Sequence, residues 1–132
     1  MKYLIDTHCF LWAAFEPRSL SKLIRERITN PENEVAVSVV SFWEISLKYA
    51  LGKLELKGVA PEDLLTSAGD MGLEVIELSP TEATSFYRLP RLAHKDPFDR
   101  LIIWQAIQRK FTLLSKDERL QDYRKHGLRI EW

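Results

Sequence analysis

Short apolar segments alternate with helical segments along the whole chain, and this alternation restricts the fold more than any other feature. The segments expected to form strands are 2–6, 34–37, 73–78, 111–114 and 128–131. Helices are expected at 7–15, 19–30, 38–51, 61–71, 80–88, 97–110 and 118–125. Strands that alternate with helices favour a parallel sheet with helices on both faces. We therefore predict an α/β fold with a central parallel sheet of about four to five strands.

Several of these helices are bounded by residues that are typical of helix ends. Ser38 and Asp96 precede helical segments, where their side chains can accept hydrogen bonds from free backbone N–H groups. Ser19 is expected to cap the second helix in the same way. Gly52 and Gly72 stand just beyond two helical segments, where glycine is common.

The size and composition indicate a soluble cytoplasmic protein. At 132 residues, positions 1–132 are expected to form a single domain. No apolar stretch is long enough to cross a bilayer, and Asp6 comes too early for a signal peptide. The single cysteine, Cys9, excludes an internal disulfide and a multi-thiolate zinc site, and it is expected to be buried.

The charges of the chain are balanced, with 19 basic and 19 acidic side chains. This balance counts against a simple phosphate-binding module, which usually has an excess of basic residues. It does not exclude an enzyme that acts on nucleic acid, because bound metal ions would reverse the sign of a local acidic cluster.

Four acidic residues stand where they can form a cluster of oxygen ligands. Asp6 and Asp117 directly follow predicted strands, and parallel sheets bind ligands beyond the carboxyl ends of their strands. Glu44 lies in the middle of an apolar helix, where capping cannot explain it. Asp99 lies in the first turn of a helix, beside an apolar face that leaves its carboxylate in need of a partner. Such a cluster suits hard divalent cations, namely Mg²⁺ or Mn²⁺.

Each acid also has an ordinary structural explanation. Asp6 and Asp117 can be helix caps, and Asp96, an aspartate before proline, is favoured as a cap with at most a supporting role. Glu44 can form an exposed i,i+4 pair with Lys48, which stabilises a helix by only about a few tenths of a kcal/mol. We favour a site role for Glu44, because its helical neighbours are mostly apolar.

A few other residues are candidates for supporting the site or contacting a substrate. Ser115 offers a hydroxyl beside Asp117 that can orient a bound water or a carboxylate. Lys48, His94 and Arg100 are candidates for substrate contact, although a solvated basic loop is the commoner explanation for the stretch around His94, and Arg100 is expected to point away from Asp99. The aromatic residues, such as Trp12, are expected in the core or at an interface more than in base stacking.

Four motifs of the chain resemble those of PIN-domain nucleases, and the likeness is greatest to the VapC toxins of bacterial and archaeal toxin–antitoxin pairs. The motifs are Leu4-Ile5-Asp6-Thr7-His8, Ser41-Phe42-Trp43-Glu44-Ile45, His94-Lys95-Asp96-Pro97-Phe98-Asp99-Arg100 and Leu114-Ser115-Lys116-Asp117. Their order and spacing match from residue 4 to near the C-terminus. The resemblance implies an acidic pocket that holds Mg²⁺ or Mn²⁺, with Asp6, Glu44, Asp99 and Asp117 at the family's acidic positions. It also implies a homodimer and a small VapB-like antitoxin whose C-terminal part blocks the pocket.

Our hypothesis is therefore metal-dependent hydrolysis of RNA phosphodiester bonds by an endoribonuclease, the toxin of a type II toxin–antitoxin system. One alternative is a magnesium-dependent phosphatase of small phosphate esters. That class usually has a second acid two residues after its nucleophilic aspartate, and His8 stands at that place. Another alternative is a non-catalytic protein- or RNA-binding module whose acids are only helix caps, which leaves Glu44 unexplained.

Overall fold

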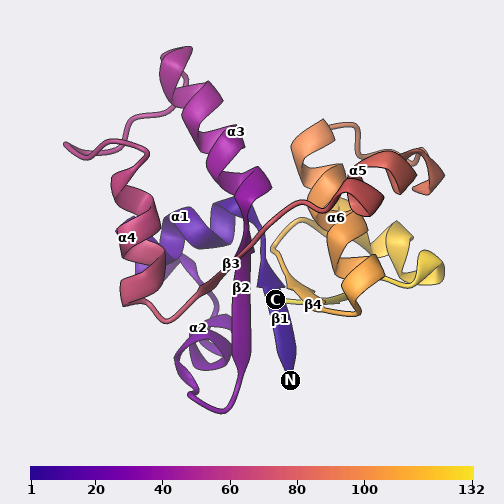
Figure 1. The fold of residues 1–132 in the computed structure, drawn as a ribbon. Helices are drawn as coiled ribbons and strands as arrows, with labels where there is room; N and C mark the ends of the chain where they lie inside the picture. Colours follow the sequence, from indigo (N-terminus) through magenta and orange to yellow (C-terminus); the bar gives the residue numbers. More distant parts are fainter.

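A five-stranded parallel sheet forms the centre of the molecule in the computed structural model, which describes residues 1–132 (Figure 1). The strands are β1 (Lys2–Ile5), β2 (Glu34–Ser38), β3 (Glu74–Ile76), β4 (Thr112–Leu114) and β5 (Arg129–Glu131). Their order is β3-β2-β1-β4-β5, so the chain builds one half of the sheet outward from β1 and then crosses to the other side. The strand order therefore reverses at β1, the place where open α/β sheets bind ligands. The predicted α/β fold with a parallel sheet is confirmed.

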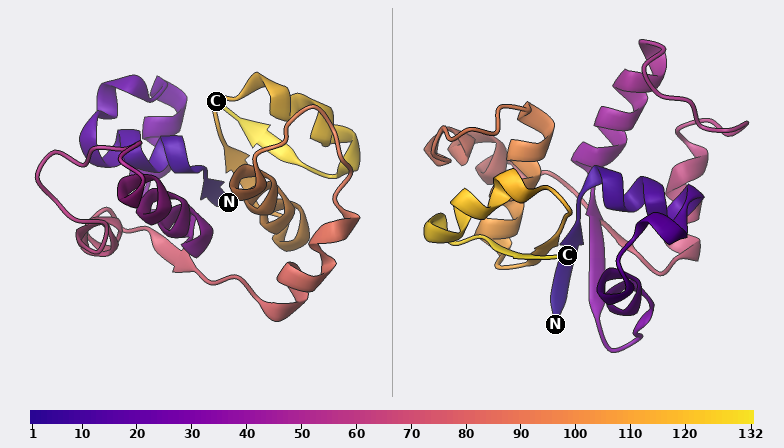
Figure 2. Two further views of the ribbon diagram at one scale, coloured as in Figure 1. Left: turned by 90° about the horizontal axis from the view of Figure 1, so that it is seen from above. Right: turned by 180° about the vertical axis from the view of Figure 1, so that it is seen from behind.

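Helices cover both faces of this sheet, as Figures 1 and 2 show. The α-helices are α1 (Thr7–Phe15), α2 (Lys22–Thr29), α3 (Val39–Ala50), α4 (Asp63–Asp70), α5 (Pro80–Ser85) and α6 (Pro97–Arg109). Three segments are 3₁₀-helices, namely η1 (Pro17–Ser19), η2 (Phe86–Arg88) and η3 (Glu118–His126). Helices α1, α2 and α4 lie on one side in Figure 1, and α5 and α6 lie on the other. None of the helices combines the length and apolar character that a membrane span requires.

The two faces of the sheet bury separate hydrophobic clusters, because successive side chains of a strand point to opposite faces. In β1, Tyr3 and Ile5 belong to the cluster under α1, α2 and α4. Leu4, between them, belongs to the cluster under α6, together with Ile102 and Ile103. Both faces of the central strand are thus fully covered, and only its ends are available for a site.

Side-chain caps determine where most helices begin. The Ser38 hydroxyl accepts a hydrogen bond from the N–H of Val40 at 3.0 Å, which confirms Ser38 as the cap of α3. The prediction that Ser19 caps the second helix is wrong. Ser19 lies in the 3₁₀ turn η1, and Ser21 caps α2 by accepting a hydrogen bond from the N–H of Ile24 at 3.1 Å.

A buried polar network connects β2, α5 and α6 on the second face of the sheet. Ser38 donates to the Oε1 of Gln105 at 2.5 Å, and the Gln105 amide donates to Glu82 at 3.1 Å. Arg109 donates to the same carboxylate, with Nε 2.7 Å from Glu82 Oε2. Burial alone would raise the pKa of Glu82, but its hydrogen bonds and the charge of Arg109 lower that pKa to about 2. Glu82 therefore stays ionised near neutral pH, and the network holds α6 in a defined position next to the start of α3.

Candidate active site

The predicted acids gather at the carboxyl ends of β1 and β4, at the point where the strand order reverses. A cavity of about 320 Å³ opens there, and Asp6, Asp99 and Asp117 line it. Glu44 lines an adjoining cavity of about 390 Å³, which Asp99 also lines. Residues that are far apart in the sequence are thus brought together around Asp99.

Each acid is positioned by a different element of the fold. Asp6 follows β1 and caps α1, because its Oδ1 accepts a hydrogen bond from the N–H of Cys9 at 2.8 Å. Asp117 caps η3 and accepts from the N–H of Arg119 at 3.0 Å. Asp99 lies in the first turn of α6, three residues after Asp96, whose side chain caps that helix. The capping explanations for Asp6, Asp96 and Asp117 are therefore correct, and in each case the cap uses only the Oδ1 atom of the carboxylate.

Glu44 is buried in the middle of α3, with only 2% of its surface exposed. Its Oε1 lies 2.7 Å from the Thr7 hydroxyl at the start of α1, and its Oε2 lies 2.5 Å from the Lys48 ammonium. The pair with Lys48 is therefore real, but it is not the exposed pair considered as the alternative. Burying a carboxylate is costly unless it is paired, so this position requires the two partners that it has.

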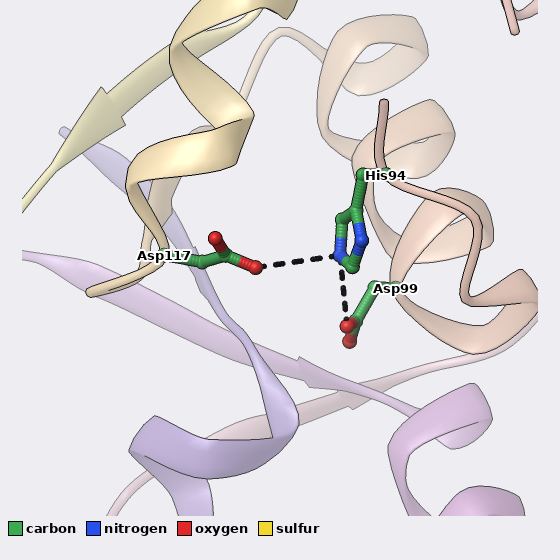
Figure 3. Close-up of side chains that lie close together, drawn as sticks. All are labelled: His94, Asp99 and Asp117. Atoms are coloured by element: carbon green, nitrogen blue, oxygen red, sulfur yellow. Dashed lines mark hydrogen bonds and ion pairs between the residues drawn. The ribbon is translucent and has the colours of Figure 1, made fainter. Parts of the chain in front are cut away.

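His94 lies between two of the acids, as Figure 3 shows. Its Nε2 is 3.0 Å from the Oδ2 of Asp99 and 3.4 Å from the Oδ2 of Asp117. Only 3% of the residue is exposed, so the expectation of a solvated basic loop is wrong for His94. The loop before α6 folds inward and places the imidazole ring against the acids, where it contacts side chains from two other segments.

The electrostatics of the cluster oppose the accumulation of negative charge. The pKa of Asp99 is raised to about 6, mainly by burial and in smaller part by the negative charges of Asp96 and Glu44. Burial also raises the pKa of Asp6, although hydrogen bonds from Ser115 and Cys9 act in the opposite direction. Both shifts indicate that a positive charge placed among these carboxylates would be strongly favoured.

Arg119 is a member of the site that sequence reasoning missed. Its Nε and Nη2 donate to the two oxygens of Asp117 at 3.1 and 2.9 Å, which is the two-pronged geometry typical of arginine with a carboxylate. Burial would raise the pKa of Asp117, but these hydrogen bonds and the charge of Arg119 lower it. The signal available in the sequence was that Arg119 follows Asp117, a candidate helix cap, by two residues.

The remaining candidates lie at the edge of the acid cluster or turn away from it. The Ser115 hydroxyl is buried and accepts a hydrogen bond from the N–H of Asp117 at 3.2 Å. Arg100 donates to the carbonyl of Leu89 at 3.1 Å, and its guanidinium lies 4.9 Å from the ring centre of Phe86. It therefore points away from the acids, as expected, and serves the loop that precedes α6.

The donor atoms of the site match those of a divalent cation centre. Two groups of side chains have donor atoms within 4.8 Å of one another, namely His94, Asp99 and Asp117, and Glu44, Asp96 and Asp99. Asp99 belongs to both groups. Asp6 belongs to neither group, but it lines one cavity together with Asp99 and Asp117. Mostly carboxylate oxygens, with one imidazole nitrogen, suit magnesium and manganese chemistry.

Comparisons with known proteins place this geometry in a family. Residues 3–126 match the PIN domain family. Ribonuclease VapC22 of Mycobacterium tuberculosis (strain ATCC 25618 / H37Rv) is 29% identical over 121 residues, which cover 92% of this chain and 91% of that protein.

Solved structures with similar folds include toxin–antitoxin complexes. VapBC2 from Rickettsia felis, bound to a DNA fragment from its promoter, matches with a TM-score of 0.71 at 20% identity, over 99% of this chain and 98% of that one. DNA-bound VapBC from Salmonella typhimurium matches with a TM-score of 0.65 at 22% identity, over 99% and 97% of the two chains. At these identities the structural matches establish the fold alone.

Proposed function

The chain belongs to the PIN-domain family, and on that basis we propose that it is an endoribonuclease that requires Mg²⁺ or Mn²⁺. The observation that carries the proposal is the convergence of carboxylates from separate elements on Asp99, at the carboxyl edge of the sheet. The similar VapC22 protein is a ribonuclease, which supports the same activity here.

In this proposal Asp6, Glu44, Asp99 and Asp117 would hold the metal, directly or through water, with His94 beside them. A bound divalent cation lowers the pKa of a water molecule and stabilises negative charge on the attacked phosphate and the leaving oxygen.

Residues around the acids keep the carboxylates in place for this role. The N–H of Cys9 holds one oxygen of Asp6, and Ser115 supports the same carboxylate. The Thr7 hydroxyl holds Glu44 at 2.7 Å. Such supporting hydrogen bonds typically change metal affinity or activity by about 10- to 100-fold when they are removed.

The proposed partners are supported by the solved structures with this fold. Several structures with this fold are VapBC structures, and VapBC-5 of Mycobacterium tuberculosis belongs to the VapBC family of toxin–antitoxin systems. We infer that this chain is the toxin of a type II pair, that it binds a VapB-like antitoxin and that it forms a homodimer. RNA is the substrate in this proposal.

Metal removal tests the proposed activity directly. Purified protein, freed of any bound partner, is incubated with labelled cellular RNA with and without Mg²⁺ or Mn²⁺. We expect discrete fragments with 5′-phosphate and 3′-hydroxyl ends that require the metal and disappear with a chelator. Cleavage that persists in chelator and leaves cyclic phosphate ends would contradict the metal-dependent mechanism.

Glu44→Gln tests whether the buried carboxylate has a role beyond its ion pair. The amide can still accept a hydrogen bond from Thr7, so we expect a small change in melting temperature and at least a 100-fold loss of cleavage, more than typically results from loss of a supporting partner. Lys48→Gln is the matched control, since it breaks the same pair at 2.5 Å but keeps the carboxylate, and cleavage is compared at saturating RNA because Lys48 is also a candidate for substrate contact. Equal, mild losses of cleavage in both variants would show that Glu44 serves only the ion pair.

A further inference from the structure

The cavity at the acids has an aromatic wall that metal chemistry does not use. Trp12 of α1 lines the cavity together with His8, Lys116 and Arg119. We propose that Trp12, with Lys116 beside it, binds an unpaired nucleobase of the RNA strand next to the phosphate that is cleaved. This inference rests on the proposed function, and it names a base-binding position within the substrate site.

The position of Trp12 is set by the helix that Asp6 caps. His8 and Trp12 are four residues apart and lie on the same face of α1, with ring centres 5.9 Å apart. His8 lines both the cavity of Asp6 and the cavity of Glu44, whereas Trp12 lines only the first. Trp12 therefore lies about 6 Å further along the helix from the acids than His8 does, which is the rise of four residues.

Trp12 is held rigidly but is not enclosed. Part of its ring packs against the hydrophobic cluster of the sheet, and its centre lies 5.8 Å from that of Trp132. The remaining surface faces the cavity, so the residue is only half-buried. A ring already fixed by packing loses little conformational freedom when a base stacks on it, which favours binding.

A cation accompanies the aromatic surface. The Lys116 ammonium lies 5.9 Å from the ring centres of both Trp12 and Trp132, within the range of a cation–π contact. Lys116 is exposed and lines the same cavity, so its charge is available to a phosphate. An aromatic platform combined with positive charge is the arrangement that binds single-stranded nucleic acid.

The other side of the acid cluster has a different composition. The cavity that contains Glu44 also contains Lys48 and Lys95, but no tryptophan, tyrosine or phenylalanine. An RNA strand that crosses the acids can thus be bound through its phosphates by the lysines on this side and through a base on the Trp12 side. A base within a duplex is already paired and stacked, so this position accepts an unpaired nucleotide.

The test measures binding of fluorescent single-stranded and duplex RNA by anisotropy, in Mg²⁺ and in an Asp6→Asn background that prevents cleavage. Trp12→Leu is expected to weaken binding of the single strand about tenfold and to leave duplex binding unchanged. Trp12→Phe keeps an aromatic face and should retain most of the affinity. Tyr87→Leu, which removes an aromatic ring that is 77% exposed outside both cavities, is the control.

An abasic scan separates base stacking from packing. An RNA that lacks one base at a time should lose about tenfold in affinity at one position, and this loss should vanish in Trp12→Leu. If Trp12→Leu does not fold, Trp12→Phe and the scan with the Trp12 protein still decide the matter. No sensitive position, or a loss that persists in Trp12→Leu, would overturn the base-binding proposal while cleavage by the parent protein stands. Absence of both cleavage and RNA binding in the parent would instead overturn the proposed function, and this inference with it.

Discussion

Asp6→Asn is expected to abolish RNA cleavage while the protein stays folded. Asparagine is as good a helix cap as aspartate, so the hydrogen bond from the N–H of Cys9, 2.8 Å long with aspartate, can be kept. The amide removes a charged oxygen ligand of the same shape, and the loss should exceed the factor of about 100 that supporting residues reach. Cleavage rates with labelled RNA at saturating Mg²⁺, together with circular dichroism and thermal melting, measure both properties.

Asp122→Asn is the matched control for this experiment. Asp122 is an exposed acid on η3 outside the cavities, and its neutralisation removes the same charge from the protein. We expect full activity from this variant. Metal-dependent cleavage by a folded Asp6→Asn protein at a rate close to that of Asp122→Asn would refute the assignment of Asp6 as a ligand.

Asp99→Asn is expected to raise the stability of the metal-free protein even as it abolishes cleavage. Burial and neighbouring acids raise the pKa of Asp99 from about 4 in the unfolded chain to about 6 in the folded protein. A raised pKa means that folding favours the protonated carboxyl, so the ionised form destabilises the fold at neutral pH. The shift corresponds to about 2 to 3 kcal/mol in the free energy of unfolding, which a neutral amide would recover.

The difference in stability between the parent and Asp99→Asn should depend on pH. In the parent, the contribution of Asp99 to the free energy of unfolding is most favourable below pH 4 and is lost as the pH rises through 6. The free energies of unfolding of the parent and Asp99→Asn, measured by urea denaturation in chelator, should therefore agree near pH 4 and diverge by pH 7. A variant that is less stable than the parent at pH 7 would contradict this prediction, because it would show that neighbouring groups already stabilise the ionised Asp99 carboxylate without metal.

Local signals in the sequence were sufficient to predict the fold and most of the acids. Caps such as Ser38 and Asp96 act on the next few residues, so their pattern is visible within one helical turn. The apolar neighbours of Glu44 in the helix pointed to a site role, but two of them, Leu47 and Leu51, are exposed, and Glu44 is buried where α3 meets Thr7 of α1. The strand–helix alternation was enough for the parallel sheet, and hence for the position of Asp6 and Asp117 at one edge.

What could not be predicted depends on contacts between distant segments or on competing local choices. The burial of His94 requires the loop before α6 to fold against η3, and no residue near His94 encodes that contact. Ser19 and Ser21 are both acceptable caps, and the choice between them depends on the 3₁₀ turn that begins at Pro17. Trp12 has the spacing of a core residue, and only the structure shows that it also lines the cavity of the site.

The origin of the four acids on separate elements has a consequence for inactivation. Asp6 and Glu44 lie in the first half of the chain, and Asp99 and Asp117 lie in the second, so a protease cut in the loop between α3 and α4 leaves neither fragment with the whole set. Pairing of β1 with β4 and of β2 with β3 is what joins the halves. Catalysis should therefore disappear in step with global unfolding, and a clipped chain whose halves separate should be harmless.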